Sequence, residues 1–182
     1  MKMKIFFAIF LLTMLVNLNN ALSQNLSQTN EEVINVVKNT MKPFLDSIPD
    51  EILINYGIKD KSEINKATVG NPIAVYTLRN DSVVFTNTWR VPLIIDKEFK
   101  SLFTVIKNND GEFKVVGFGA TVLAKEIFSK SNEIELIGLL RVYELQKDFF
   151  ICDGTNDGQE FQPIPDPEKR KYTLNDILNL VK

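Results

Sequence analysis

Residues 102–118 read LFTVIKNNDGEFKVVGF, and this stretch decides the fold class. Two apolar runs, 102–107 and 113–118, flank Asn108-Asn109-Asp110-Gly111. Asn, Asp and Gly tolerate the left-handed backbone conformations that a tight hairpin turn requires. The stretch therefore predicts two antiparallel strands joined by a turn.

Further strand patterns lie on both sides of this hairpin. Residues 73–78 predict a strand, and residues 83–91 predict a second one in which apolar and polar residues alternate. Pro92 cannot donate a backbone hydrogen bond, so we expect this second strand to lie at an edge of the sheet or to break there. Residues 134–142 and 149–152 predict another hairpin.

Three amphipathic segments predict helices, because their apolar residues recur at spacings of three and four. They cover residues 31–47, 121–130 and a final segment that starts after the capping pair Thr173 and Asp176. A further short helix is predicted over residues 49–55, opened by Pro49-Asp50 and capped by Gly57. Residues 153–167 are rich in Asp, Gly and Pro and predict a loop, with an extended backbone over its prolines.

This order of elements predicts an α+β fold. We expect an antiparallel sheet of about six strands built from hairpins, with N-terminal, middle and C-terminal helices packed on it. The outline of a helix wrapped by antiparallel hairpins resembles cystatin-like folds. That resemblance implies an architecture only, since the Gln-x-Val-x-Gly loop of protease-inhibiting cystatins is absent from the chain.

The first residues predict export. Two lysines precede the apolar run 5–16, and Ala21-Leu22-Ser23 offers the small residues that a signal peptidase recognises. We expect a cleaved signal peptide over residues 1–23 and a single domain over 24–182, with 24–30 disordered. The apolar run is shorter than the about 20 residues of a spanning helix, and no Cys lies at the cut. The prediction is a periplasmic or extracellular protein that is not a lipoprotein and keeps no stable membrane anchor.

Composition excludes several classes of chemistry. The chain has no His and one Cys, which rules out Ser-His-Asp and Cys-His catalysis, the usual zinc sites and an internal disulfide. Cys152 follows an apolar run and is predicted to be a buried residue of a strand. The formal net charge of −2 argues against a nucleic-acid partner. No motif indicates a cofactor.

Candidate binding residues come from the aromatic side chains of the predicted sheet. We predict that a binding surface includes Trp89, Arg90, Phe85, Tyr76 and Tyr143, with Trp89 and Arg90 exposed at an edge. The alternative is that the aromatic residues fill the core between sheet and helices.

The segment from Asp153 to Gly158 is a candidate calcium loop. Asp153, Thr155 and Asp157 alternate as side-chain oxygen ligands would, and Gly158 permits a sharp turn. Position 12 of the pattern is Ile164, where a bidentate Glu belongs. The alternative is an ordinary turn-rich loop.

These observations leave three functions open. The first is a non-catalytic interaction protein that binds a peptide or protein partner through an edge strand or an exposed sheet face. The second is a small-molecule-binding protein with a pocket between the sheet and its helices. The third is a hydrolase that uses paired carboxylates. The near pairs are Asp96 with Glu98, Glu133 with Glu135, Glu144 with Asp148 and Asp166 with Glu168, of which Asp96 and the pair Glu133 with Glu135 are the strongest candidates.

Overall fold

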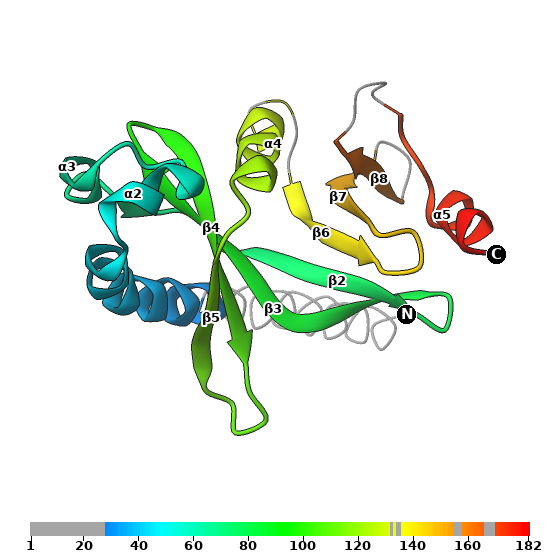
Figure 1. Cartoon of the computed structure of the whole chain (residues 1–182). Helices are drawn as coiled ribbons and strands as arrows, with labels where there is room; N and C mark the ends of the chain where they lie inside the picture. The colour runs from blue at the N-terminus through cyan, green and yellow to red at the C-terminus, as the bar shows by residue number, and fades with distance from the viewer. Residues whose placement is uncertain (1–27, 132, 134–135, 155–157, 166–169) are drawn as a thin grey trace, which may run out of the picture.

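The computed structural model describes residues 28–131, 133, 136–154, 158–165 and 170–182, and Figure 1 shows their arrangement. The predicted signal peptide and the residues Thr155 and Asp157 lie outside them. In the described part of the chain, no helix is long and apolar enough to cross a membrane.

The class is α+β, as predicted. One mixed sheet holds eight strands within the described residues, in the spatial order β5-β4-β3-β2-β6-β7-β8, with β1 paired to β3. The strands are β1 Thr68–Val69, β2 Ile73–Arg79, β3 Ser82–Ile95, β4 Glu98–Lys107, β5 Phe113–Gly119, β6 Leu136–Val142, β7 Lys147–Asp153 and β8 Gln159–Ile164.

Helices form in all four segments for which the sequence predicts them, and α3 (Lys61–Ile64) adds one that was not predicted. The first covers residues 28–47 of the described chain, three residues before its predicted start. Gly57 ends the second predicted helix, residues 49–55, in a left-handed conformation. Thr173 and Asp176 form the predicted capping box of the last helix. The remaining helices are α2 Asp50–Leu53, η1 Ile54–Tyr56, α3 Lys61–Ile64, α4 Thr121–Ser131 and α5 Leu174–Val181.

Three hairpins form between strands that the sequence predicts as consecutive. Asn80 and Asp81 both adopt positive φ between β2 and β3, and Gly111 does so between β4 and β5. The third hairpin joins β6 to β7, where Gln146 has positive φ. These turns place neighbouring strands antiparallel, as the sequence indicates.

The prediction of a purely antiparallel sheet of about six strands is wrong, because β2 and β6 pair in parallel. After the β2–β5 meander the chain passes through α4 and adds β6 beside β2, on the side of the meander opposite to β5. Figure 1 shows α4 above this crossing, with β6 beside β2. A hairpin turn cannot make a parallel pair, so a long connection is needed.

The sheet separates two environments. We call the side that carries Trp89 and Phe103 the aromatic face, and the side that carries Arg90 and Leu102 the α4 face. The helix of residues 28–47 and α5 bury their apolar residues against the aromatic face. α4 buries Ala124 and Ile127 against the α4 face, with Leu102, Leu139 and Phe150.

Pro92 lies inside the sheet, so the prediction of an edge or a break there is wrong. β3 is flanked by β4 on one side and by β1 and β2 on the other. The carbonyl of Pro92 accepts a hydrogen bond from the Gly70 N–H at 2.8 Å. The ring nitrogen of Pro92 faces the same side, where β1 has ended at Val69 and β2 has not begun. The missing donor of the proline therefore falls opposite Gly70, between β1 and β2, and removes no bond from either strand.

The loop predicted over residues 153–167 contains the extended strand β8, so that prediction is wrong in part. Phe161 exchanges two hydrogen bonds with Tyr172 on the outer side of β8. Pro163 lies two residues further along and points its ring nitrogen the same way, so the pairing with β7 loses no donor.

Candidate functional site

Alternation along β3 directs adjacent side chains to opposite faces of the sheet. Trp89 is only 5% exposed on the aromatic face, so the prediction that it lies exposed at an edge is wrong. Its ring contacts Phe85 and Phe113, at centroid distances of 5.0 and 5.3 Å. Tyr76 extends this row from β2, 5.5 Å from Phe85. Trp89 therefore serves the core, whereas Phe85 at its side keeps 36% exposure.

Arg90 points to the α4 face and lines a cavity of about 390 Å³. The cavity lies over the central strands β3, β2, β6 and β7, with α4 on one side. We call it the arginine pocket, and it is lined by Val75, Thr86, Thr88, Arg90, Leu123, Leu139, Arg141, Tyr143 and Asp148. Of the five predicted binding residues, Arg90 and Tyr143 meet here, whereas Tyr76, Phe85 and Trp89 do not.

A bulge in β3 positions Thr86 and Thr88, which form one side of the arginine pocket. The register between β2 and β3 shifts between Val75 and Tyr76, and Asn87 takes a positive φ of 54°. The Thr86 hydroxyl donates to the Val75 carbonyl at 2.7 Å, which closes the bulge. Bulges of this kind re-aim side chains beside binding sites.

The two arginines of the pocket differ in their partners. Arg141 lies opposite Asp148 in the β6–β7 ladder and donates to its carboxylate at 2.8 Å. The Arg141 guanidinium also lies 5.8 Å from the centre of the Tyr143 ring, a cation–π contact. Arg90 donates one hydrogen bond to the Thr104 hydroxyl and forms no ion pair among the described residues.

Burial shapes the electrostatics of Arg90. It lowers the pKa of the Arg90 guanidinium, while the nearby Asp148 charge opposes this shift and Arg141 adds to it. A guanidinium remains charged in proteins and carries five N–H donors. Arg90 is half-buried, and most of its N–H donors have no hydrogen-bond partner among the described residues. An anion beside it is favoured, because water screens the charge of a half-buried guanidinium less than that of an exposed one.

The floor of the arginine pocket is apolar. Val75 from β2, Leu123 from α4 and Leu139 from β6 supply it, and Leu139 is buried. Polar groups therefore stand around an apolar base, an arrangement typical of a site for a small molecule. Two arginines and one aspartate give the pocket a formal charge of +1.

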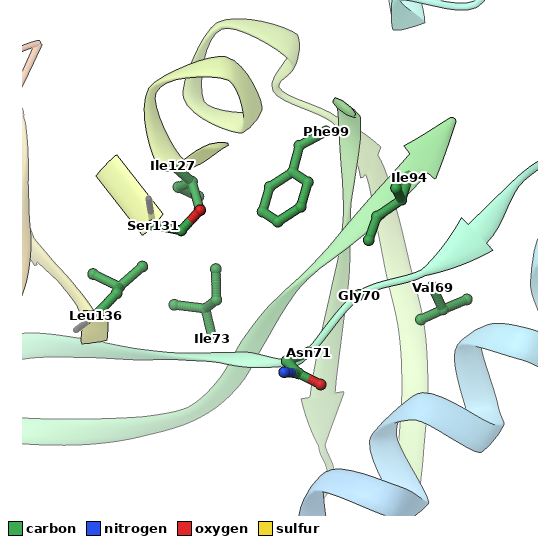
Figure 2. Close-up of a pocket in the computed structure, with 9 residues that line it drawn as sticks. All are labelled: Val69, Gly70, Asn71, Ile73, Ile94, Phe99, Ile127, Ser131 and Leu136. Atoms are coloured by element: carbon green, nitrogen blue, oxygen red, sulfur yellow. The ribbon is translucent and has the colours of Figure 1, made fainter. Parts of the chain in front are cut away.

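α4 also borders a second cavity, of about 520 Å³, near the β1–β2 junction. Figure 2 shows Ile73, Phe99 and Ile127 pointing toward its centre. Asn71 and Ser131 are its polar lining side chains, and no charged group of the described residues lines it. Ser131 and Leu136 flank residues 132, 134 and 135, which the structure does not describe, so we assign it no ligand.

Cys152 is buried in β7 at 2% exposure, as predicted, and packs with Phe150 and Leu139 against α4. Burial raises the pKa of its thiol, and Glu160 adds to the effect. A thiol kept protonated in an apolar setting is a poor nucleophile. Cys152 therefore acts as a small core residue.

The predicted calcium ligands cannot be placed together, since Thr155 and Asp157 lie outside the described residues. Asp153 is exposed at the end of β7. Among the residues that the structure describes, no group of three or more Cys, Asp or Glu side chains is arranged to hold a metal ion. Of the predicted carboxylate pairs, Asp148 is the member that lines the arginine pocket, and it is paired with Arg141.

Sequence reasoning missed Arg141 and the apolar floor, and it named Asp148 only as half of a possible catalytic carboxylate pair. The alternation of residues 83–91 did place Thr86, Thr88 and Arg90 on one face, which was the available signal. Searches against protein-family models, curated proteins and solved structures find no match to this chain.

Proposed function

We propose that this protein is an exported, non-catalytic protein that binds a small anionic molecule in the arginine pocket. The observation that carries the proposal is Arg90, a half-buried guanidinium without a carboxylate partner among the described residues, over an apolar floor. Arg141 lines the same pocket, and its guanidinium group supplies a second set of N–H donors. The paired N–H donors of a guanidinium group fit the spacing of the oxygen atoms in a carboxylate, sulfonate or phosphate.

Size and shape support a small ligand. The volume of about 390 Å³ falls within the usual range for small-molecule sites. The apolar side chains of Val75, Leu123 and Leu139 favour a compact apolar body attached to the anionic group. A benzene ring that carries one acidic group is a suitable probe of this geometry.

The test is thermal unfolding of residues 24–182 with benzoate or benzenesulfonate, compared with their neutral amides. A ligand at about 100-fold over its Kd stabilises the folded state by about 2.7 kcal/mol. We expect the anions to raise Tm and the amides to have little effect. Arg90→Met and Arg141→Met should lose the shift, whereas Arg79→Met, which removes an exposed arginine outside the pocket, should keep it. Equal shifts in all variants would refute the proposal.

A second candidate function is peptide addition to the outer edge of β5, which pairs with no further strand in the part of the chain that the structure describes. This strand ends the sheet, and Val116 on it is 55% exposed. The opposite end is occupied, because β8 already bonds with Tyr172. A peptide that adds to β5 should slow hydrogen exchange of β5 amides and leave the melting shift by anions unchanged.

Export is tested separately by mass spectrometry of the protein recovered outside the cytoplasm. We expect an N-terminus at Gln24. A chain that retains Met1 would contradict the proposed cleavage.

A further inference from the structure

The arginine pocket contains a carboxylate as well as two guanidinium groups. Asp148 accepts a hydrogen bond from Arg141, and its charge also acts on Arg90. The side chains of Arg141 and Asp148 are 37% and 28% exposed, so the ion pair lies at the surface of the cavity. An anion that enters the pocket therefore meets two positive charges and one negative charge.

A carboxylate beside an anion site discriminates by charge. One negative charge on a ligand balances the +1 of the pocket. A second charge has no partner there and is repelled by Asp148 in a site partly withdrawn from water. Asp148 itself stays paired, because its partner Arg141 comes from the next strand in register.

We infer that Asp148 restricts the arginine pocket to monoanions, so that its ligand is a compact apolar molecule bearing one acid group with a single charge. Arg90 supplies the cation that the ligand neutralises, and the ion pair of Arg141 with Asp148 sets the charge limit. This inference rests on the proposed function, since it concerns the ligand of the same pocket.

The probes are benzenesulfonate and phenylphosphonate, which share a phenyl body and a tetrahedral head. At about pH 8.5 the phosphonate carries close to two negative charges, whereas the sulfonate carries one. Isothermal titration calorimetry would compare their Kd values for the native protein, for Asp148→Asn and for the control Asp81→Asn. Asp81 is exposed at the β2–β3 turn, so its substitution removes one carboxylate outside the pocket.

We expect the native protein and Asp81→Asn to bind benzenesulfonate about tenfold or more tightly than phenylphosphonate. Asp148→Asn should abolish or reverse that preference, chiefly by tightening phenylphosphonate. If Asp148→Asn does not fold, Asp148→Ser serves in its place. Native protein that binds both probes equally, or an unchanged ratio in the Asp148 variant, would overturn the inference and leave the anion pocket standing. Failure of both probes to bind any variant would overturn the proposed function and the inference with it.

Discussion

Trp89 and Arg90 are adjacent in β3, yet they belong to opposite regions of the molecule. Trp89 is buried between the rings of Phe85 and Phe113 on the aromatic face. Arg90 faces the arginine pocket, with Thr104 as its hydrogen-bond partner. The comparison teaches that one strand can stabilise the fold with one set of side chains and form a binding site with the other.

The comparison predicts its largest effect for the aromatic face. Trp89→Ala should lower the free energy of unfolding by about 3–5 kcal/mol, because it removes a buried ring and leaves a cavity. Arg90→Met should change it by less than about 1 kcal/mol, since methionine keeps an apolar stem and no buried ion pair is broken. Urea unfolding followed by circular dichroism measures both. Similar losses for the two variants would contradict the division of roles.

The next effect concerns the glycines of the sheet. A Cβ on Gly138 would lie 2.7 Å from the Tyr76 ring and 2.9 Å from the Ala74 carbonyl oxygen. Gly138→Ala should therefore cost about 1–3 kcal/mol, because the parallel β2–β6 pair must move apart. Gly117→Ala is the control, since its nearest atom would be 3.5 Å away. A neutral Gly138→Ala in the same urea experiment would argue against the close packing of Tyr76 on β6.

The smallest effect concerns Cys152. Burial raises the pKa of this thiol in the folded state, so folding favours the protonated form. The corresponding stability is fully present below the unfolded pKa of about 8.5 and is lost as pH rises above it. Cys152→Ala should therefore show a shallower fall in stability above this pH than the native protein does. Tm measured across alkaline pH tests this, and parallel pH profiles would contradict it.

Local elements of this fold are predictable from local pattern. The turn at 108–111, the capping box at Thr173 and the Gly57 cap each depend on residues close together in sequence. These features succeed because neighbouring backbone geometry determines them. Alternation in β3 implies opposite faces for Trp89 and Arg90, yet the prediction placed both on one exposed surface, which was wrong for Trp89.

The partners of each strand are less predictable. The spacing of apolar residues does not indicate beside which strand the chain re-enters the sheet after a helix. The parallel pairing of β2 with β6 was therefore not predicted. β8 was not predicted because prolines are typical of loops. They fit this strand only because its proline nitrogen faces away from β7, which the sequence does not reveal. The arginine pocket depends on the same long-range pairing, since Arg90 and Arg141 come together only when β2 pairs with both β3 and β6.

The most direct test of the account is NMR of the arginine side chains during titration with benzenesulfonate. Spectra of Arg90→Met, Arg141→Met and Arg79→Met would assign the Nε–H signals by loss of one peak each. We expect the Arg90 and Arg141 signals to shift and saturate together with one Kd, while the Arg79 signal stays fixed. Uniform small shifts of all three, without saturation, would mean that the pocket is not an anion site and would contradict the central claim.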